Sequence, residues 1–214
     1  MKNCGRGVLI VFEGVDGAGK TTQINLLAER LAKSGYCPVM TREPGGTRLG
    51  EAVRELLLDK KYGSLSVKAE ALLYAAARAQ HVEELIAPAL REGKVVLCDR
   101  FTDSTLAYQG YGRGVSLSTL EAVNEFVSCG VSPDLVLILD LSPEEGLARI
   151  DRSRRPADRM EGEEASFYRR VREGYLNLAA RRPGRYRVVN AGRPAEEVHE
   201  EIWRAVEGVL GCTP

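Results

Sequence analysis

The stretch that most limits the possible folds of this chain is residues 14 to 21, which read Gly-Val-Asp-Gly-Ala-Gly-Lys-Thr. An apolar run, Val8 to Phe12, precedes it directly, and leucines with helical spacing follow it. Glycines let the backbone turn tightly, so that successive N–H groups and the positive end of the next helix can surround an anion. The stretch matches the whole phosphate-binding pattern G-x-x-x-x-G-K-[ST], the P-loop. A chance glycine-rich turn is the alternative, and the strand before and helix after argue against it.

Two side chains of this loop carry specific chemistry. Lys20 supplies a mobile positive charge for the outer phosphates of a nucleotide, and the Thr21 hydroxyl is suited to ligate Mg²⁺. The sequence therefore predicts a nucleoside triphosphate site that works with Mg²⁺.

Short apolar runs alternate with segments of helix length along the whole chain. Unbroken apolar runs are typical of strands that are buried on both faces of a parallel sheet. The alternation predicts an α/β fold, a parallel five-stranded sheet flanked by helices, with right-handed crossovers. The expected strands are residues 8–12, 37–41, 95–98, 135–139 and 186–189, and the expected helices are residues 20–33, 49–59, 67–92, 116–129, 143–151, 163–181 and 195–210. We expect residues 1–214 to form a single domain.

Composition argues against several other classes of protein. Thirty Lys and Arg residues balance thirty Asp and Glu residues, so net charge favours neither nucleic acid nor an anionic membrane as a partner. The five cysteines lie far apart, which indicates neither a zinc site nor a disulfide framework. No apolar stretch reaches the length of a membrane span. We therefore expect a cytoplasmic protein.

A carboxylate and a guanidinium follow the third apolar run, as Asp99 and Arg100. In an open α/β sheet, ligands bind in the crevice at the carboxyl ends of the strands. A P-loop enzyme needs an acid there to hold Mg²⁺, and an adjacent arginine can clamp a phosphate with two hydrogen bonds. The alternative is that Asp99 only caps the following loop, but the P-loop makes the metal role the better interpretation.

Three further segments fall near the same edge of the sheet. Residues 41–47 read Thr-Arg-Glu-Pro-Gly-Gly-Thr, and residues 103–110 follow Asp99 and Arg100 closely. Tyr74 and Arg78 are four residues apart on an expected helix and share one of its faces. Together they could stack on a base and donate to its edge. The pair alone, however, is better interpreted as a core-facing Tyr beside an exposed Arg.

These blocks, taken together, resemble the thymidylate kinases, and bacterial ones in particular. The matching blocks are residues 12–22 (FEGVDGAGKTT), 41–47 (TREPGGT), 74–80 (YAAARAQ), 99–101 (DRF), 107–110 (AYQG) and 158–161 (DRME). They occur in the family's order and spacing and cover nearly the whole chain. The P-loop alone would indicate only an NTPase or a kinase, whereas REPGG and DRF…AYQG are far more specific. The resemblance implies a P-loop kinase fold and ATP-dependent phosphorylation of thymidine monophosphate (dTMP) to dTDP, for dTTP biosynthesis.

The resemblance also implies a role for each site residue. Asp16 would contact the 3′-hydroxyl of the substrate, Arg54 and Arg100 would hold its phosphate, and residue 74, a Phe in most relatives, would stack on thymine. The implied substrate-binding residues are Asp16, Glu43, Pro44, Arg54, Tyr74, Arg78, Arg100, Thr105, Tyr108 and Gln109. The implied ATP-binding residues are Gly14, Val15, Asp16, Gly17, Ala18, Gly19, Lys20, Thr21, Thr22 and Arg149, with the turn at residues 190–193 beside the adenine. Mg²⁺ would be held by Thr21 and Asp99.

The source of the catalytic cations follows from the composition of the loop. Phosphoryl transfer depends on positioning and cations, and this P-loop has one basic residue, Lys20. Residues 149–159 are dense in arginine, and by itself such a stretch is usually a solvated turn. The resemblance reverses that interpretation, because some thymidylate kinases place catalytic arginines in a lid, here residues 150–162. The implied catalytic residues are Lys20, Asp16, Arg100, Arg152, Arg154 and Arg155.

Two other functions stay open from the sequence. One is another nucleoside monophosphate or deoxynucleoside kinase, because bases differ by single contacts. The other is a regulatory P-loop NTPase that acts as a switch, although the guanine-specific Asn-Lys-x-Asp tetrapeptide is absent from the sequence. The family resemblance further implies a homodimer.

Overall fold

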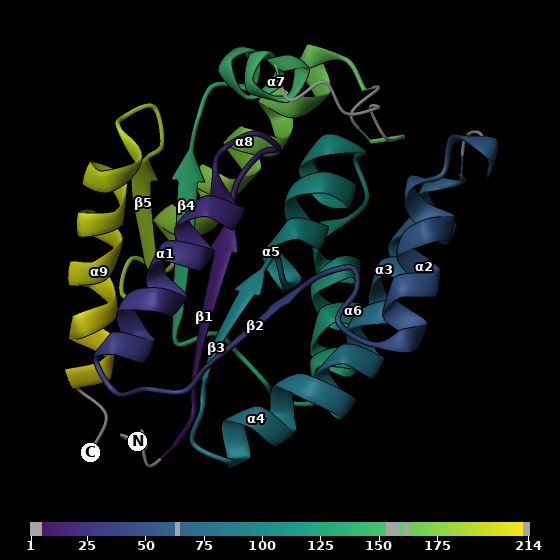
Figure 1. Cartoon of the computed structure of the whole chain (residues 1–214). Coiled ribbons are helices and arrows are strands. Elements are labelled where there is room, and N and C mark those ends of the chain that lie inside the picture. Colours follow the sequence, from purple (N-terminus) through teal and green to yellow (C-terminus); the bar gives the residue numbers. More distant parts are fainter. Residues whose placement is uncertain (1–5, 63–64, 153–158, 161–162, 212–214) are drawn as a thin grey trace.

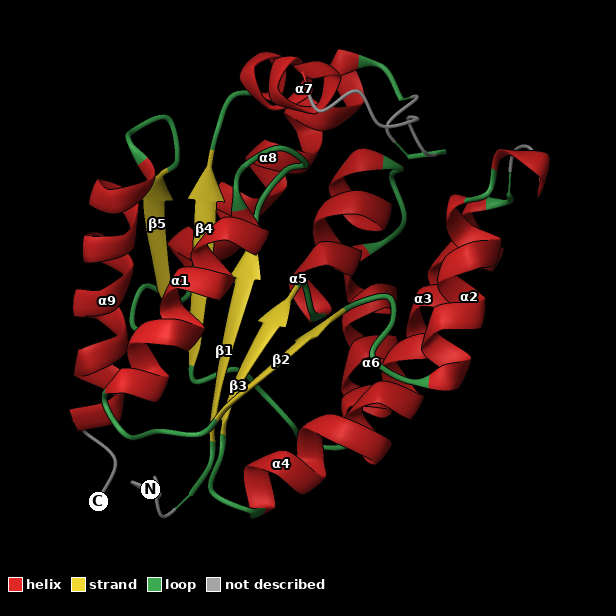
Figure 2. Ribbon diagram, in the orientation of Figure 1, coloured by secondary structure: helices red, strands yellow, loops and turns green. Residues whose placement is uncertain are grey.

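A parallel sheet of five strands forms the centre of the molecule (Figure 1, Figure 2). The computed structural model describes residues 6–62, 65–152, 159–160 and 163–211. The strands are β1 (Val8–Glu13), β2 (Pro38–Arg42), β3 (Val95–Asp99), β4 (Leu135–Asp140) and β5 (Tyr186–Asn190). Their order is β2-β3-β1-β4-β5, and every neighbouring pair is parallel. The predicted sheet is confirmed.

Burial explains why some strands are easier to see in the sequence than others. All six residues of β1 are buried, and β3 and β4 are buried except at their last residue. The edge strands β2 and β5 include exposed positions. The inner strands therefore have unbroken apolar sequences, whereas the edge strands have mixed ones.

Helices cover both faces of this sheet (Figure 1). On one face α1 (Lys20–Lys33) packs beside α9 (Ala195–Gly211), and on the other α8 (Ala165–Arg181) packs against β4 and β5. A second group of helices packs together to one side of the sheet. Its members are α2 (Arg48–Leu58), α3 (Val67–His81) and α6 (Leu117–Ser128). The helix α7 (Pro143–Arg152) was expected from the sequence. A short 3-10 turn, Lys60–Tyr62, was not.

The long helix expected over residues 67–92 is interrupted. After α3 the chain forms a π-helical segment, Val82–Ile86, and then the short helix α4 (Ala87–Arg91). Pro88 supplies the physical reason, because its ring lacks an N–H and would clash with the carbonyl of Glu84 in a regular α-helix. A π turn widens the helix at that point and removes the conflict.

A helical segment that we did not expect follows β3. It consists of α5 (Thr102–Thr105) and the π-helical segment Leu106–Gly112. Gly110 and Gly112 weaken the helical signal in the sequence. Packing explains both glycines: an added Cβ would lie 2.5 Å from the side chain of Leu117 and 2.6 Å from that of Phe167, respectively.

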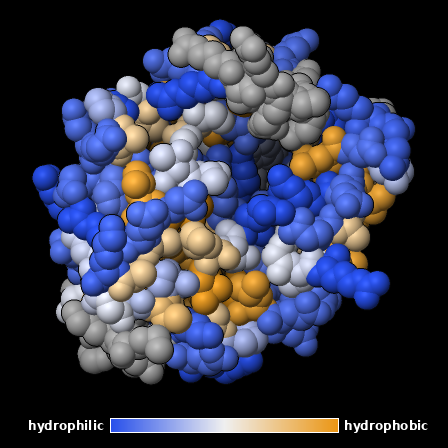
Figure 3. All heavy atoms as spheres, viewed as in Figure 1, coloured by the Kyte–Doolittle hydropathy of each residue, from blue (hydrophilic) through white to orange (hydrophobic). Residues whose placement is uncertain are grey.

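The functional motifs gather at the carboxyl edge of the sheet. Phe12 of β1 is in register with Asp99 of β3, so the P-loop begins next to the Asp-Arg motif. The space-filling view, in the orientation of Figure 1, shows a hollow near the centre that is lined mainly by hydrophilic residues (Figure 3). None of the described helices is both long and apolar enough to span a membrane.

Candidate active site

The P-loop connects β1 to α1 and takes a shape that only glycine permits at several positions. Gly14, Gly17 and Gly19 have φ angles of 134°, 78° and 88°, which other residues rarely adopt. A Cβ on Gly17 would lie 2.3 Å from the carbonyl oxygen of Gly146 in α7. The glycine therefore permits both the turn and the close approach of α7.

Lys20, the first residue of α1, points back into this loop. Its side chain is buried, and Nζ donates to the carbonyl oxygens of Gly14 and Val15, at 3.1 Å each. Burial lowers the pKa of Lys20, and the nearby Arg100 lowers it further. The ammonium group thus lies where a bound phosphate can replace the two carbonyl oxygens as its partner.

A cavity lies between the P-loop and the ends of β2 and β3. Its lining residues are Asp16, Gly17, Gly19, Lys20, Thr21, Thr22, Arg42, Glu43, Arg54, Asp99 and Arg100. Asp99 Oδ1 is buried and has no hydrogen-bond partner in the described part of the chain. A buried carboxylate oxygen without a partner is rare unless water or a cation reaches it.

Asp99 and Thr21 could provide the few protein ligands that Mg²⁺ needs, but they do not form a metal site built from protein side chains alone. The described residues contain no group of three or more His, Cys, Asp or Glu side chains arranged to hold a metal. Mg²⁺ binds through one or two protein ligands together with phosphate and water oxygens. Asp99 Oδ1, buried beside the P-loop without a partner among the described residues, matches that requirement.

Arg100 joins the P-loop to the second cavity. Its guanidinium donates to Asp16 Oδ1 at 2.6 Å and to the hydroxyl oxygens of Tyr108 at 3.1 Å and Tyr175 at 3.0 Å. Burial by itself would raise the pKa of Asp16, but Arg100 and Lys20 outweigh it, and the pKa is lowered. Asp16 is therefore an ionised acceptor. The backbone of Arg100 has a φ of 72°, an unusual value for a residue with a side chain.

Glu13, the last residue of β1, is a site residue that the sequence analysis missed. It is fully buried and accepts hydrogen bonds from the Phe101 N–H at 2.8 Å, the Ser104 hydroxyl at 2.6 Å and the Tyr175 hydroxyl at 2.9 Å. Burial, together with the charge of Asp103, raises its pKa to about 7. An acidic residue at the end of an apolar strand was the only signal of this role in the sequence.

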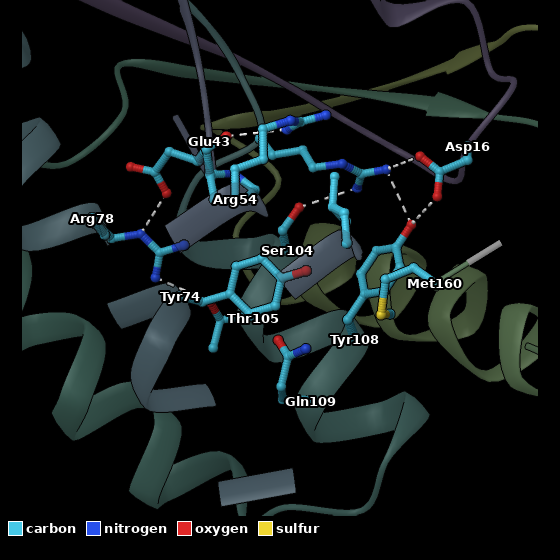
Figure 4. A pocket seen from close by; sticks show the side chains of 13 residues that line it. Asp16, Glu43, Arg54, Tyr74, Arg78, Ser104, Thr105, Tyr108, Gln109 and Met160 are labelled. Atoms are coloured by element: carbon cyan, nitrogen blue, oxygen red, sulfur yellow. Dashed lines mark hydrogen bonds and ion pairs between the residues drawn. The ribbon is translucent and has the colours of Figure 1, made fainter. Parts of the chain in front are cut away.

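The second cavity brings together every residue for which the sequence analysis predicted substrate binding (Figure 4). The lining consists of Asp16, Glu43, Pro44, Arg54, Leu58, Tyr74, Arg78, Arg100, Ser104, Thr105, Tyr108, Gln109 and Met160. Leu58, Ser104 and Met160 are the additions. Figure 4 shows Asp16 and Arg78 toward opposite ends, with Tyr74, Thr105 and Gln109 between them.

Four residues line both cavities. They are Asp16, Glu43, Arg54 and Arg100. Arg54 donates to the carbonyl oxygen of Pro44 at 3.0 Å and remains only partly buried. Two guanidinium groups therefore lie where the cavities adjoin. That boundary is suited to an anionic group shared between two ligands.

Arg78 is not the exposed arginine that the alternative interpretation required. Its side chain is 2% exposed and donates to Glu43 Oε2 at 2.7 Å, Thr105 Oγ1 at 3.0 Å, Asn124 Oδ1 at 2.6 Å and the Phe101 carbonyl at 2.9 Å. A guanidinium has five N–H groups. One N–H is therefore left over among the described contacts, and it is available to a ligand in the cavity.

Tyr74 presents an aromatic ring to the same cavity. Burial raises the pKa of its hydroxyl well above the usual range, and the charge of Glu70 adds to this effect, so the side chain is neutral. No described residue makes a hydrogen bond with that hydroxyl. A neutral ring in a polar cavity is suited to stack on a flat heterocycle.

A third cavity borders the outer side of the P-loop. Arg149 lines it and donates to the carbonyl oxygens of Ala191 at 3.0 Å and Gly17 at 3.4 Å. Arg193 also lines it and forms an ion pair with Glu201. Arg149, Ala191 and Arg193 therefore border one cavity beside the P-loop. That the base of a nucleotide lies there stays a prediction.

The arginine-rich stretch gives a different outcome. The side chain of Arg152 and the whole of Arg154 and Arg155 lie outside the described residues. At the end of this stretch, Arg159 donates to the carbonyl oxygen of Leu57 at 2.7 Å, and the next residue, Met160, lines the second cavity.

Comparison with known proteins agrees with this geometry. The thymidylate kinase family matches residues 12–202. A thymidylate kinase of Pelotomaculum thermopropionicum is 64% identical over 96% of this chain and 95% of its own length, and one of Halothermothrix orenii is 51% identical over 96% and 99%. The crystal structure of thymidylate kinase from Ehrlichia chaffeensis has a TM-score of 0.76 at 38% identity and covers 94% of this chain and 99% of that one. This chain therefore belongs to the thymidylate kinase family.

Proposed function

We propose that this protein is an ATP-dependent kinase that phosphorylates dTMP to dTDP, for dTTP biosynthesis. The observation that carries the proposal is the pair of adjoining cavities that share Asp16, Glu43, Arg54 and Arg100. One cavity contains the P-loop, and the other contains a neutral aromatic ring with polar side chains around it. A donor and an acceptor can therefore meet at two guanidinium groups.

In the proposed reaction the acceptor phosphate lies between Arg54 and Arg100. One of its oxygens attacks the γ-phosphorus of ATP in line, the bond from that phosphorus to the β–γ bridging oxygen breaks, and ADP leaves. Lys20 exchanges its contacts with two loop carbonyls for contacts with the transferred group. The side chains contribute mainly by holding the reacting groups in place and by offsetting negative charge.

Asp16 and Tyr74 bind the nucleoside in this proposal. The ionised carboxylate of Asp16 accepts a hydrogen bond from the 3′-hydroxyl, and the Tyr74 ring stacks on thymine. The remaining N–H of Arg78, together with Thr105 and Gln109, contacts the edge of the base. Each of these groups lines the second cavity, which we call the acceptor cavity.

We further propose that Asp99 and Thr21 hold Mg²⁺ with the phosphates of ATP. Bound there, the ion would offset the negative charge of the phosphate oxygens. The support is the buried, unpaired Asp99 Oδ1 in the cavity that Thr21 and Lys20 also line.

Arg152, Arg154 and Arg155 are proposed as the additional catalytic cations, within a single domain of residues 1–214 that has a lid at about residues 150–162. The support is the sequence, because Val15, Asp16, Gly17 and Ala18 provide no basic residue in the loop. An arginine that reaches the transferred phosphate raises turnover on the order of a thousandfold. Replacing the three arginines with alanine should lower kcat far more than it raises the KM for dTMP, and an unchanged kcat would refute the lid role.

A panel of nucleoside monophosphates tests the main proposal. The purified protein, with ATP and Mg²⁺, should release ADP fastest when dTMP is the acceptor. A clear preference for another monophosphate would make the protein a different nucleotide kinase. Slow ATP hydrolysis that no acceptor accelerates would instead indicate a regulatory NTPase.

We also propose that the protein is a cytoplasmic homodimer. Support for self-association comes from α3 and α6, which pack together and carry the exposed apolar side chains of Leu72 and Phe126, 61% and 84% exposed. Exposed apolar groups of this size on adjacent elements often mark an interface. The cytoplasmic location follows from the proposed use of ATP and dTMP.

A further inference from the structure

The orientation of one amide in the acceptor cavity is set from outside the cavity. Gln109 is 1% exposed, lines the cavity, and donates from Nε2 to Glu70 Oε1 at 2.8 Å. An ionised carboxylate only accepts hydrogen bonds, so the nitrogen of the amide must be the atom that faces Glu70. No described residue donates to Gln109 Oε1, which leaves this acceptor for a ligand.

Glu70 is ionised because two arginines hold it. Its carboxylate, 1% exposed, accepts from Arg113 Nε at 2.7 Å and from an Arg159 terminal nitrogen at 2.7 Å. Burial by itself would raise the pKa of Glu70, but the hydrogen bonds from Arg113, Gln109 and Arg159 lower it. The carboxylate therefore stays an acceptor at neutral pH, and the amide of Gln109 cannot turn over without losing its partner.

A fixed acceptor at this place distinguishes pyrimidine bases. Thymine and uracil carry a hydrogen-bond donor at N3, whereas N3 of cytosine is an acceptor. Gln109 Oε1 can accept a hydrogen bond from N3 of thymine or uracil, whereas it would face another acceptor at N3 of cytosine. A site whose buried polar groups are oriented for one pattern rejects a ligand that leaves them unpaired.

We propose that Glu70 is a positioning residue that sets base specificity: it fixes the Gln109 amide with its oxygen toward the base and so excludes cytosine. The proposal rests on the proposed function, because it requires a pyrimidine base in this cavity. Arg113, directly after the π-helical segment Leu106–Gly112, and Arg159, at the end of the arginine-rich stretch, keep the carboxylate in place.

The test compares the dissociation constants of dTMP, dUMP and dCMP, measured by calorimetry or by displacement, in the wild type and in Glu70→Gln. A glutamine side chain at position 70 can donate as well as accept, so the Gln109 amide is free to turn over. The preference for dTMP over dCMP should fall on the order of tenfold, the value of about one hydrogen bond. The preference for dTMP over dUMP should not change, because both bases carry the N3 donor. Equal weakening of all three ligands would overturn the proposal.

Glu163→Gln is the matched control. Glu163 pairs with the same Arg113 at 2.8 Å but does not contact Gln109. Glu163→Gln removes one negative charge from the group formed by Glu70, Arg113, Arg159 and Glu163, and it should leave the preference for dTMP over dCMP intact. A loss as large as that of Glu70→Gln would mean that the charge of the cluster, and not the orientation of the amide, governs specificity.

Two further measurements test the same inference, and the second uses only the wild type, so it does not depend on the folding of Glu70→Gln. In a Gln109→Ala background, Glu70→Gln should have no additional effect on the dTMP:dCMP preference, since Glu70 acts through Gln109. In the wild type, the NMR signals of the Gln109 side-chain NH₂ should stay protected from exchange with and without dTMP. Loss of this protection on adding dTMP would show that the nitrogen has left Glu70 and would contradict the proposal. The wild-type monophosphate panel separates failure of this inference from failure of the proposed function.

Discussion

Two carboxylates three residues apart ionise differently because the charges around them differ. Glu13 and Asp16 both flank the start of the P-loop, and burial favours the neutral form of each. Arg100 contacts Asp16 directly at 2.6 Å, whereas Glu13 is held by hydroxyl and backbone donors. The pKa of Glu13 is therefore raised to about 7 while that of Asp16 is lowered. Burial therefore dominates at Glu13, whereas at Asp16 the nearby positive charges of Arg100 and Lys20 outweigh it.

The raised pKa of Glu13 makes the stability of the protein depend on pH. Between its ordinary pKa of 4.5 and about 7, folded Glu13 keeps a proton that the unfolded chain has released. The free energy of unfolding should therefore decline as the pH rises through this window, by up to about 3 kcal/mol, and level off above it.

Glu13→Gln isolates this contribution, because glutamine cannot titrate. In urea unfolding at about pH 5 and about pH 8, the variant should gain stability relative to the wild type at the higher pH. Identical differences at the two pH values would show that Glu13 is ionised throughout.

Tyr74 should act through its ring and not through its hydroxyl. Tyr74→Ala should weaken dTMP binding by roughly tenfold to a hundredfold, since stacking of a base on an aromatic ring contributes about 1–3 kcal/mol. Tyr74→Phe should change the dissociation constant by no more than about twofold, because the hydroxyl has no partner among the described residues to lose. Calorimetry on both variants checks this, and a Phe variant as weak as the Ala variant would assign the binding energy to the hydroxyl.

At the scale of elements, α7 supports the P-loop from outside. Gly146 of α7 contacts the loop so closely that an added Cβ would lie 2.5 Å from the carbonyl oxygen of Asp16. On the other side of the same contact, a Cβ added to Gly17 would lie 2.3 Å from the carbonyl oxygen of Gly146. The position of the phosphate-binding backbone thus depends on a helix more than a hundred residues away in the sequence.

Gly146→Ala should therefore lower kcat/KM for ATP by about tenfold to a hundredfold, because a displacement of less than about 1 Å misplaces the bound phosphates. Gly208→Ala is the control, since Gly208 in α9 has nothing within 4 Å of an added Cβ. It should leave kinetics unchanged and stabilise the protein by up to about 1 kcal/mol through helix propensity. Equal kinetics for both variants and the wild type would show that α7 does not position the loop.

At the scale of the whole molecule, the exposed apolar side chains on α3 and α6 lead to a prediction about assembly. Light scattering after size exclusion should give the wild type a mass of twice the 23.4 kDa chain. Leu72→Glu combined with Phe126→Glu should give the mass of one chain, because charges would be buried at the interface. Val188→Glu on β5, also at an exposed apolar position, should leave the dimer intact. A wild type with the mass of a monomer would exclude the proposal.

Local patterns in the sequence determined most of the architecture. The five strands and the P-loop were predicted correctly, since unbroken apolar runs and glycine spacing act through neighbours along the chain. The residues predicted to bind the substrate all line one cavity, because motifs at the ends of parallel strands meet at the same edge. Their roles in binding and catalysis stay predictions that the experiments above test.

Only the tertiary structure decided the features that depend on residues far apart in the sequence. The helical segment at 102–112 forms although two glycines weaken it, because α8 and α6 pack where their side chains would be. Arg78 is buried because four oxygen atoms, from three segments far from it in the sequence, accept from it. The P-loop itself shows the division: its sequence specified a cradle for phosphate, whereas Arg100 and α7, brought beside it by folding, decided the charge of Asp16 and the position of the loop. Charge and close contact depend on distance in space, which a linear pattern does not contain.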